Sequence, residues 1–164
     1  AIYAVAKNTG PTVLSSSPTN GATGVGVSDN ITVYFDKPID NNTVNLSNFE
    51  LKGSDNHLVT GSVYVDNNSI TFDPADNLSS LDNYTLLLRP EVWDQLGNSL
   101  SPTEIQFTTF LAGLGTASDP YQIGNEAELK AITDNLAANY LLKDNITLSG
   151  LWLPLGSATN KFKL

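Results

Sequence analysis

Residues 30–36 read NITVYFD, and this stretch gives the clearest indication of the fold. Ile31, Val33 and Phe35 alternate with side chains suited to solvent, which is the period of two expected for a β-strand with one buried face. The run begins with Asn and ends with Asp, residue types that are depleted in strands and common in turns. We therefore predict a short, half-buried strand bounded by turns.

The same alternation recurs along residues 11–110 in five further segments, NFELKG, LVTGSVYVD, NSITFD, NYTLLLRP and TEIQFTTF. Turn-forming clusters such as SPTNGATG and VDNNSI separate them. With the opening TVLSSSP they make about seven strands, which predicts an all-β fold, an antiparallel two-sheet β-sandwich. The residues expected in its core are Ile31, Val33, Phe35, Val63, Val65, Ile70, Phe72, Leu86, Leu88, Ile105 and Phe107.

The composition excludes several classes of partner. Net charge is −9, with only eight Lys and Arg, so phosphate repulsion argues against nucleic acid and equally against an anionic membrane surface. No stretch has the length of a transmembrane helix, so no membrane insertion is expected. The chain has no cysteine, which removes disulfides, thiolate metal sites and cysteine catalysis.

The segment PTVLSSSPTNGATGVGVSDNITVYFDKPID, residues 11–40, resembles the opening of the bacterial Ig-like domains of S-layer proteins and other cell-surface chains. That family begins with a strand, a Ser-Pro-x-x-Gly-Ala turn, a Val, and a strand ending Phe-x-x-Pro-hydrophobic-Asp. Later come Pro-x-x-x-Leu, Tyr-Thr and an Asp-x-x-Gly-Asn turn. The resemblance covers residues 11–110 and implies an Ig-like sandwich. The matching residues are Ser17, Pro18, Gly21, Ala22, Val25, Phe35, Pro38, Asp40, Pro74, Leu78, Tyr84, Thr85, Asp94, Gly97 and Asn98.

Residues 115–132, GTASDPYQIGNEAELKAI, depart from the strand pattern. Asn125 is a good helix N-cap, and Glu128 three residues later completes a capping-box arrangement, so a helix is predicted over about 125–138. One apolar stripe along this helix must pack on another element. The stripe consists of Leu129, Ile132 and Leu136.

The segments GTASDPYQI, NYLLKDNITLSG and WLPLGS, together with this helix, resemble the N-terminal cap segment of cell-surface β-solenoids of the GLUG-repeat adhesin kind. The resemblance implies that the helix is a lid that covers the open end of a solenoid. Two departures are visible, because Asn145 takes the place of the usual Asp and SATNKFKL stands where the first coils are expected. We therefore expect residues 1–10 to be an extension, 11–110 the sandwich, and 111–164 a truncated cap segment.

The sequence offers few residues for chemistry, and we predict no catalytic, cofactor-binding or metal-binding residues. His57 is the only histidine and stands in a turn-like context, which favours a surface loop over catalysis. The carboxylate pairs Asp36 with Asp40 and Asp73 with Asp76 lie at strand ends, where Asp commonly bonds to backbone, whereas a glycosidase needs two carboxyls across a cleft. Calcium remains the alternative, with Asp36, Asp40, Asp73, Asp76 and Asp94 as candidate ligands.

Trp93 and Trp152 fit either sugar-stacking platforms or core packing, and their contexts favour core packing. Asn-x-Ser/Thr sequons also occur, but in so Asn-rich a chain composition explains them better than glycosylation. They begin at Asn30, Asn41, Asn45, Asn67, Asn77, Asn83 and Asn145.

The resemblances imply a non-enzymatic structural or adhesion module of a secreted or cell-surface microbial protein. The sandwich would be an extracellular spacer or stalk, its partners the neighbouring domains of the same protein, with a carbohydrate or host-surface ligand also open. Two alternatives remain. The chain could be an accessory module of an extracellular polysaccharide-active enzyme, because surface solenoids include polysaccharide lyases. It could also be a subunit of a self-assembling filament, in which AIYAVA associates by strand addition.

Overall fold

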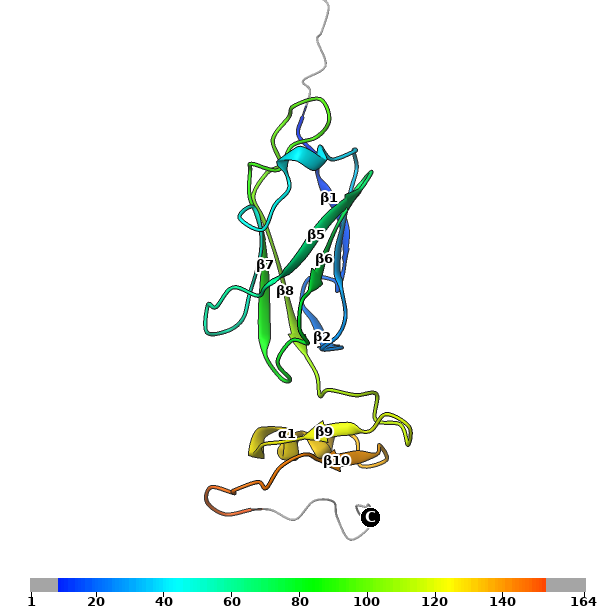
Figure 1. The fold of residues 1–164 in the computed structure, drawn as a ribbon, viewed down its shortest axis with the longest axis vertical. Coiled ribbons are helices and arrows are strands. Elements are labelled where there is room, and N and C mark those ends of the chain that lie inside the picture. The colour runs from blue at the N-terminus through cyan, green and yellow to red at the C-terminus, as the bar shows by residue number, and fades with distance from the viewer. Residues whose placement is uncertain (1–8, 153–164) are drawn as a thin grey trace, which may run out of the picture.

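A computed structural model describes residues 9–152 of the chain and shows a β-sandwich followed by a smaller unit (Figure 1). The expectations for AIYAVA and for most of WLPLGS lie outside the described residues. Each sheet of the sandwich has four strands, and the predicted all-β sandwich is confirmed. The first sheet has the order β1 (Val13–Ser17), β3 (Ile31–Phe35), β6 (Ser69–Pro74), β5 (Gly61–Asp66). The second has the order β2 (Ala22–Val25), β8 (Thr103–Thr109), β7 (Asn83–Leu88), β4 (Phe49–Lys52).

The core lies between the two sheets and is built from alternating residues of the strands. Ile31 and Val33 of β3 are fully buried, and Phe72 of β6 is opposite Ile31 in the ladder. This is the inward face that the period of two predicts. Val63 and Val65, also predicted as core, are only partly buried, because β5 is the last strand of its sheet. Core residues absent from the prediction include Ile39, Phe49, Leu51, Tyr84, Val92 and Leu100.

One strand was missed, because β2 lies within the segment predicted to be a turn. Gly21 and Gly24 adopt φ of 80° and 74°, a left-handed conformation that favours glycine and interrupts any regular alternation. Between them the chain still pairs with β8, and this pairing is parallel, with Ala22 opposite Phe107. The prediction of a purely antiparallel sandwich is therefore wrong for this pair of strands.

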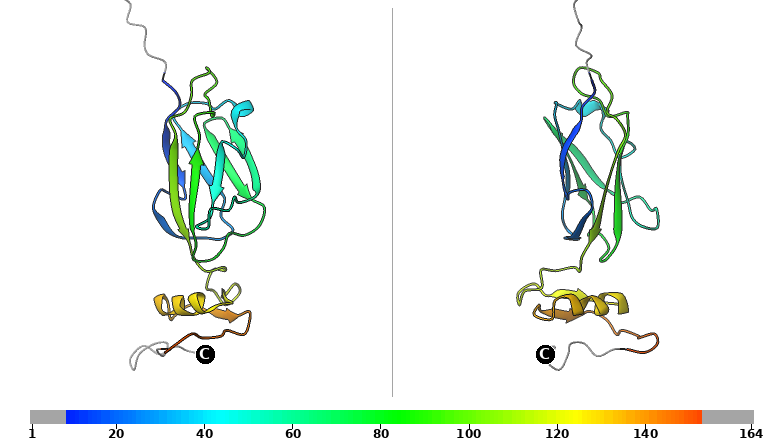
Figure 2. Two further views of the ribbon diagram at one scale, coloured as in Figure 1. Left: turned by 90° about the vertical axis from the view of Figure 1, so that its left-hand side faces the viewer. Right: turned by 180° about the vertical axis from the view of Figure 1, so that it is seen from behind.

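The smaller unit pairs β9 (Tyr121–Ile123) with β10 (Tyr140–Leu142) in parallel. A helical segment joins them, consisting of α1 (Glu126–Ala131) and η2 (Ile132–Asp134), a 3₁₀ turn. Figure 2 shows α1 running alongside the two strands. Each residue of β9 pairs with the residue of β10 that lies 19 positions later in the chain, so Tyr121 is opposite Tyr140.

The helix begins where the capping residues predict and ends earlier than expected. Asn125 Oδ1 accepts a hydrogen bond from the Glu128 N–H at 2.9 Å, while Glu128 Oε2 accepts from the Gly124 N–H at 2.7 Å. The predicted end at about 138 is wrong. Asn135 Oδ1 accepts from the Ala137 N–H, and such a local side-chain bond competes with the helical hydrogen-bond pattern.

A second, small hydrophobic core holds this unit together and connects it to the sandwich. Leu111, Ile123 and Ile132 are its buried members. The sandwich contributes Leu81 and Phe110, and Phe110 meets Tyr121 edge to face with ring centroids 5.2 Å apart. The other side chains packed on this core are Tyr121, Leu129, Ala131, Leu136, Tyr140 and Ile146. Of the predicted apolar stripe, Ile132 is buried, Leu129 is partly buried, and Leu136 packs here from the turn after the helix.

Along residues 9–152, no helix is both long and apolar enough to cross a lipid bilayer.

Candidate functional site

One end of the sandwich is formed by two loops that hydrogen bonds hold together. The first loop begins with η1 (Asn41–Thr43), which Asp40 caps by accepting from the Asn42 N–H at 3.0 Å. Asn48 then accepts from the Asn45 N–H at 2.9 Å through its side chain. The second loop begins after β7, and the Arg89 N–H donates to the carbonyl of Asn48 at 2.9 Å. We call this end, residues 40–48 and 89–99, the polar end.

Asp94 is the centre of the second loop and is only 2% exposed. Its Oδ1 accepts from the N–H groups of Leu96 and Asn98, each at 2.9 Å, and the Asn98 side-chain amide donates to both carboxylate oxygens. Lys37 Nζ lies 4.0 Å from Oδ2. Burial raises the pKa of Asp94, but the hydrogen bonds from Asn98 and Leu96 outweigh it, so the pKa lies below its ordinary value. The carboxylate stabilises the turn.

The other predicted calcium ligands are not brought together. Asp36 Oδ1 accepts from the Thr12 N–H at 2.6 Å, and Asp40 caps η1. Asp73 and Asp76 are exposed on and just beyond β6. Within the described part of the chain, no three His, Cys, Asp or Glu residues are grouped so that they could hold a metal ion. The calcium alternative therefore gains no support from residues 9–152.

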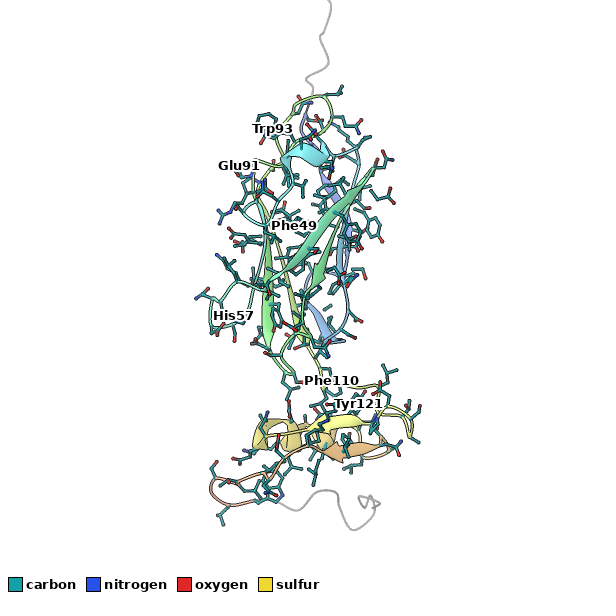
Figure 3. The ribbon with its side chains drawn as sticks, viewed as in Figure 1. Phe49, His57, Glu91, Trp93, Phe110 and Tyr121 are labelled. Carbon is teal, nitrogen blue, oxygen red and sulfur yellow. The ribbon has the colours of Figure 1, made fainter. Side chains whose placement is uncertain are left out.

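His57 lies in the exposed loop between β4 and β5, where its ring contacts Asp55. It lines a pocket of about 170 Å³ together with Asp76 and Tyr84. The hydroxyl of Tyr84 accepts from the Ser79 N–H at 2.9 Å, which stabilises the turn before β7. Figure 3 places His57 on the side of the sandwich, away from the polar end.

Trp93 contradicts the expectation of core packing, because it is 45% exposed. Its neighbours Val92 and Asp94 are both buried, so the alternation of the chain points Trp93 outward. Its Nε1–H donates to the Pro90 carbonyl at 3.2 Å, which fixes the indole beside the second loop. Trp152 is only partly buried, and Lys130 Nζ lies 5.9 Å from its ring centroid.

Two pockets at the polar end share Arg89. One, of about 400 Å³, is lined by Leu87, Leu88, Arg89, Pro90, Pro102, Thr103 and Glu104. The other, of about 380 Å³, is lined by Asn45, Ser47, Asn48, Glu50, Arg89 and Glu91. We call the two pockets together the Arg89 groove.

Arg89 is held in place by a salt bridge across the sheet. Its Nη2 donates to Glu50 Oε2 at 2.9 Å, and Lys52 Nζ lies 3.4 Å from the same oxygen. The hydrogen bond from Arg89 lowers the pKa of Glu50 below its ordinary value. Glu50 therefore stays ionised, and the groove keeps a fixed pattern of donors and acceptors.

Sequence reasoning identified no residue of this groove as a site residue. The side chains come from loop 45–48, from the ends of β4 and β7 and from the start of β8, segments distant in sequence. For Trp93, which lies beside the groove, the available signal was VWD at residues 92–94, where an aromatic residue stands between two inward-facing positions.

The family model of the bacterial Ig-like domain matches residues 7–109. Among solved structures, CopC from Methylosinus trichosporium OB3b is 14% identical with a TM-score of 0.50, over 61% of this chain and 93% of that chain. The N-terminal part of the bacterial S-layer protein SbsC is 22% identical with a TM-score of 0.48, over 61% of this chain and 23% of that one. L,D-transpeptidase 3 from Mycobacterium tuberculosis is 24% identical with a TM-score of 0.44, over 62% and 39% of the two chains.

No curated protein matches the chain. The likeness to CopC shows a shared fold, and the chain corresponds to about a quarter of the S-layer chain that it matches. The family model covers well over half of the sequence, and the strands that it spans form the sandwich described above. The chain belongs to the family of bacterial Ig-like domains.

Proposed function

We propose that the chain is a non-enzymatic spacer of a secreted or cell-surface microbial protein, which transmits force between its neighbours and presents a β-solenoid at its C-terminal end. Membership of the bacterial Ig-like family supports a structural role. The bacterial surface layer protein SbsC contains a segment similar to this one.

The parallel pairing of β2 with β8 is the observation that carries this proposal. The Gly21 N–H donates to the Gln106 carbonyl at 2.7 Å, and the Phe110 N–H donates to the Val25 carbonyl at 2.9 Å. Tension applied at the chain ends pulls two parallel neighbours in opposite directions along their length. The hydrogen bonds between β2 and β8 are then loaded in shear. All of them must break at the same time, so they resist the applied force together.

The chain also enters and leaves the sandwich at opposite ends, as a spacer requires. Gly10 packs against the Ser99 backbone at the polar end, and Lys37 Nζ bonds to the carbonyl of Thr9. The exit lies at the other end, where β8 runs into Phe110 and the smaller unit (Figure 1). A force along the chain therefore acts along the long axis of the sandwich.

Single-molecule pulling on the full chain tests the spacer role. Attachment at the two chain ends is expected to unfold the smaller unit first and the sandwich at a clearly higher force. The control is a variant with Ser62→Cys and Asp73→Cys, exposed residues that are opposite each other in β5 and β6. Because the chain has no cysteine, these thiols are unique handles, and pulling on them opens an antiparallel ladder one pair at a time. Equal unfolding forces in both geometries contradict the proposal.

The solenoid-cap role rests on the open edge of β10. Among the residues that the structure describes, β10 has one hydrogen-bonded neighbour, β9, and Leu141 and Leu142 are 47% and 64% exposed. A pair of parallel strands offset by 19 residues has the form of one solenoid coil, on which a further parallel strand can stack. The helix packs against β9, the strand farther from the proposed docking edge, which is consistent with its proposed role as a lid.

Fusion to a designed β-solenoid that lacks its own N-terminal cap tests this role. We expect the full chain, placed before the solenoid, to raise its melting temperature and suppress its aggregation. The matched control carries Leu141→Lys and Leu142→Lys, which leave the chain folded because both side chains are exposed. If the control protects the solenoid equally well, the edge of β10 is not a docking edge.

The two alternatives remain separate proposals. An accessory role in a polysaccharide-active enzyme requires a catalytic part beyond these 164 residues. A filament role depends on AIYAVA, and chromatography of the chain with and without residues 1–8 tests it. Monomeric behaviour of both forms would exclude strand addition through this segment.

A further inference from the structure

We propose that the polar end carries a binding site for an uncharged, β-linked pyranose oligosaccharide, formed by the indole of Trp93 and the Arg89 groove. This site is independent of the spacer role, since it uses neither β2 nor the smaller unit. It would give the domain a ligand of its own in addition to its mechanical role.

The indole of Trp93 provides a planar apolar surface that is exposed and fixed. It is 45% exposed, although the residues on either side of it in sequence are buried. The Trp93 backbone N–H donates to Thr43 Oγ1 at 3.0 Å, and the indole N–H donates to the carbonyl of Pro90 at 3.2 Å. Because the indole is already held in place, a ligand that stacks on it does not have to immobilise this side chain, and the entropy cost of binding is smaller.

Pyranoses of the gluco configuration fit such a surface because all their ring hydrogens are axial. Each face of the ring then presents C–H groups with a partial positive charge to the negative face of the indole. In a β-1,4-linked chain the flat faces continue from one residue to the next. This chemistry favours a β-linked oligosaccharide over a branched or α-linked one.

The Arg89 groove begins at the anchor of the indole, because Pro90 lines one of its pockets. The two pockets, of about 400 and 380 Å³, have volumes in the range of ~300–1,000 Å³ that is usual for small-molecule sites. The first pocket combines the apolar residues Leu87, Leu88, Pro90 and Pro102 with polar ones, and the second is lined by polar and charged residues that can bond to sugar hydroxyls. The polar contributors are Asn45, Ser47, Asn48, Glu50, Arg89, Glu91, Thr103 and Glu104.

The charges of the groove favour a neutral ligand. Arg89 is already paired with Glu50 at 2.9 Å, so its charge is compensated within the protein. Glu91 and Glu104 add negative charge, and the whole chain carries −9. An acidic polysaccharide would meet net repulsion, whereas hydroxyl groups can bond to both guanidinium and carboxylate without charge matching.

The groove is pre-organised by Asn48, which is 6% exposed. Its side chain accepts from the Asn45 N–H and donates to the Thr43 carbonyl, and its carbonyl accepts from the Arg89 N–H. The two loops that form the site are thus joined through one buried residue. Figure 3 shows Trp93 and Glu91 projecting from the same end of the sandwich.

Titration of the full chain with cellohexaose and with chitohexaose, followed by calorimetry, tests the site. We expect at least one of them to bind with a Kd below about 1 mM, and Trp93→Ala to weaken binding by roughly tenfold or more. Trp152→Phe is the matched control and keeps full affinity, because Trp152 lies in the smaller unit. Arg89→Lys, which retains the charge and loses the planar fork, is expected to weaken binding about threefold to tenfold.

Circular dichroism and the melting temperature of each variant show whether it is folded, and Trp93→Ala keeps the backbone hydrogen bond to Thr43. The proposal is overturned if neither oligosaccharide binds, or if Trp93→Ala binds as tightly as the parent chain. It is also overturned if polygalacturonate or oligolysine binds at this end and both neutral sugars do not. None of these outcomes affects the pulling experiment, so the two proposals fail separately.

Discussion

Asp94→Ala is expected to destabilise the sandwich by about 3 kcal/mol, because it removes the acceptor of several buried hydrogen bonds at once. The N–H groups of Leu96 and Asn98 and the Asn98 amide lose their partner, and Lys37 loses its nearest carboxylate. Asp94 is 2% exposed, so water does not replace these bonds without a rearrangement of the loop. Urea denaturation measures the change as a lower midpoint.

The matched control is Asp76→Ala, since Asp76 is exposed. We expect this variant to lie within roughly 0.5 kcal/mol of the parent chain. Asp94→Asn keeps the shape of the side chain but removes its charge, and the new amide nitrogen cannot accept a hydrogen bond. We expect this variant to lower the free energy of unfolding by about 2 kcal/mol. A loss below about 1 kcal/mol for Asp94→Ala would show that the turn does not depend on the carboxylate.

The pH dependence of stability follows from the same residue. The folded-state pKa of Asp94 lies below its ordinary value of 3.8, so its contribution is present above that value and is lost as pH falls through the folded pKa. The pKa values of Asp36 and Glu50 are lowered as well, by the hydrogen bond from the Thr12 backbone and by the hydrogen bond from Arg89 respectively. The parent chain should therefore lose stability in acid below about pH 4, and Asp94→Ala should lose less over the same range.

Phe49→Ala is expected to destabilise the sandwich by about 3–5 kcal/mol, the loss usual for removal of a fully buried phenylalanine side chain. Phe49 is fully buried and begins β4, opposite Leu88 of β7 (Figure 3). Its removal leaves a cavity at the junction of the core with the polar end. Because small domains are stable by only about 5–15 kcal/mol, the variant should be close to unfolding at body temperature.

Chemical denaturation with an unchanged m-value measures this loss, and Tyr34→Ala is the control on the outer face of β3. Tyr34 is 45% exposed, and its truncation should lower stability by less than about 1 kcal/mol. Comparable losses for the two variants would mean that the buried face has been assigned incorrectly. A lower m-value for Phe49→Ala would instead report a looser native state.

Much of the sandwich could be predicted because its central strands alternate cleanly. The alternation in β3, β6, β7 and β8 identified the inward residues, since a strand with one buried face must repeat every two residues. The pattern failed for β2, where Gly21 and Gly24 take left-handed conformations inside a strand-forming segment. The pattern also overestimated the burial of Val63 and Val65 in β5, because β5 is the last strand of its sheet.

The candidate site could not be predicted from local pattern, because it is assembled by contacts between distant loops. Trp93 was assigned to the core from its place beside the Asp-x-x-Gly-Asn turn, yet its direction is set by Val92 and Asp94, which both point inward. Arg89 and Glu50 are 39 residues apart and meet only through the pairing of β4 with β7. The helix after Asn125, in contrast, begins where its capping residues predict, since capping depends on neighbours in the chain.

The opposite placement of entry and exit in the sandwich has a consequence for how such proteins change over generations. A gene duplication that inserts a second copy in line adds the length of one sandwich to the molecule and leaves its width unchanged. Each added copy moves the smaller unit farther from the N-terminal end of the chain. Each copy would also add one more polar end, so that the reach of the molecule and its number of exposed indole surfaces grow together.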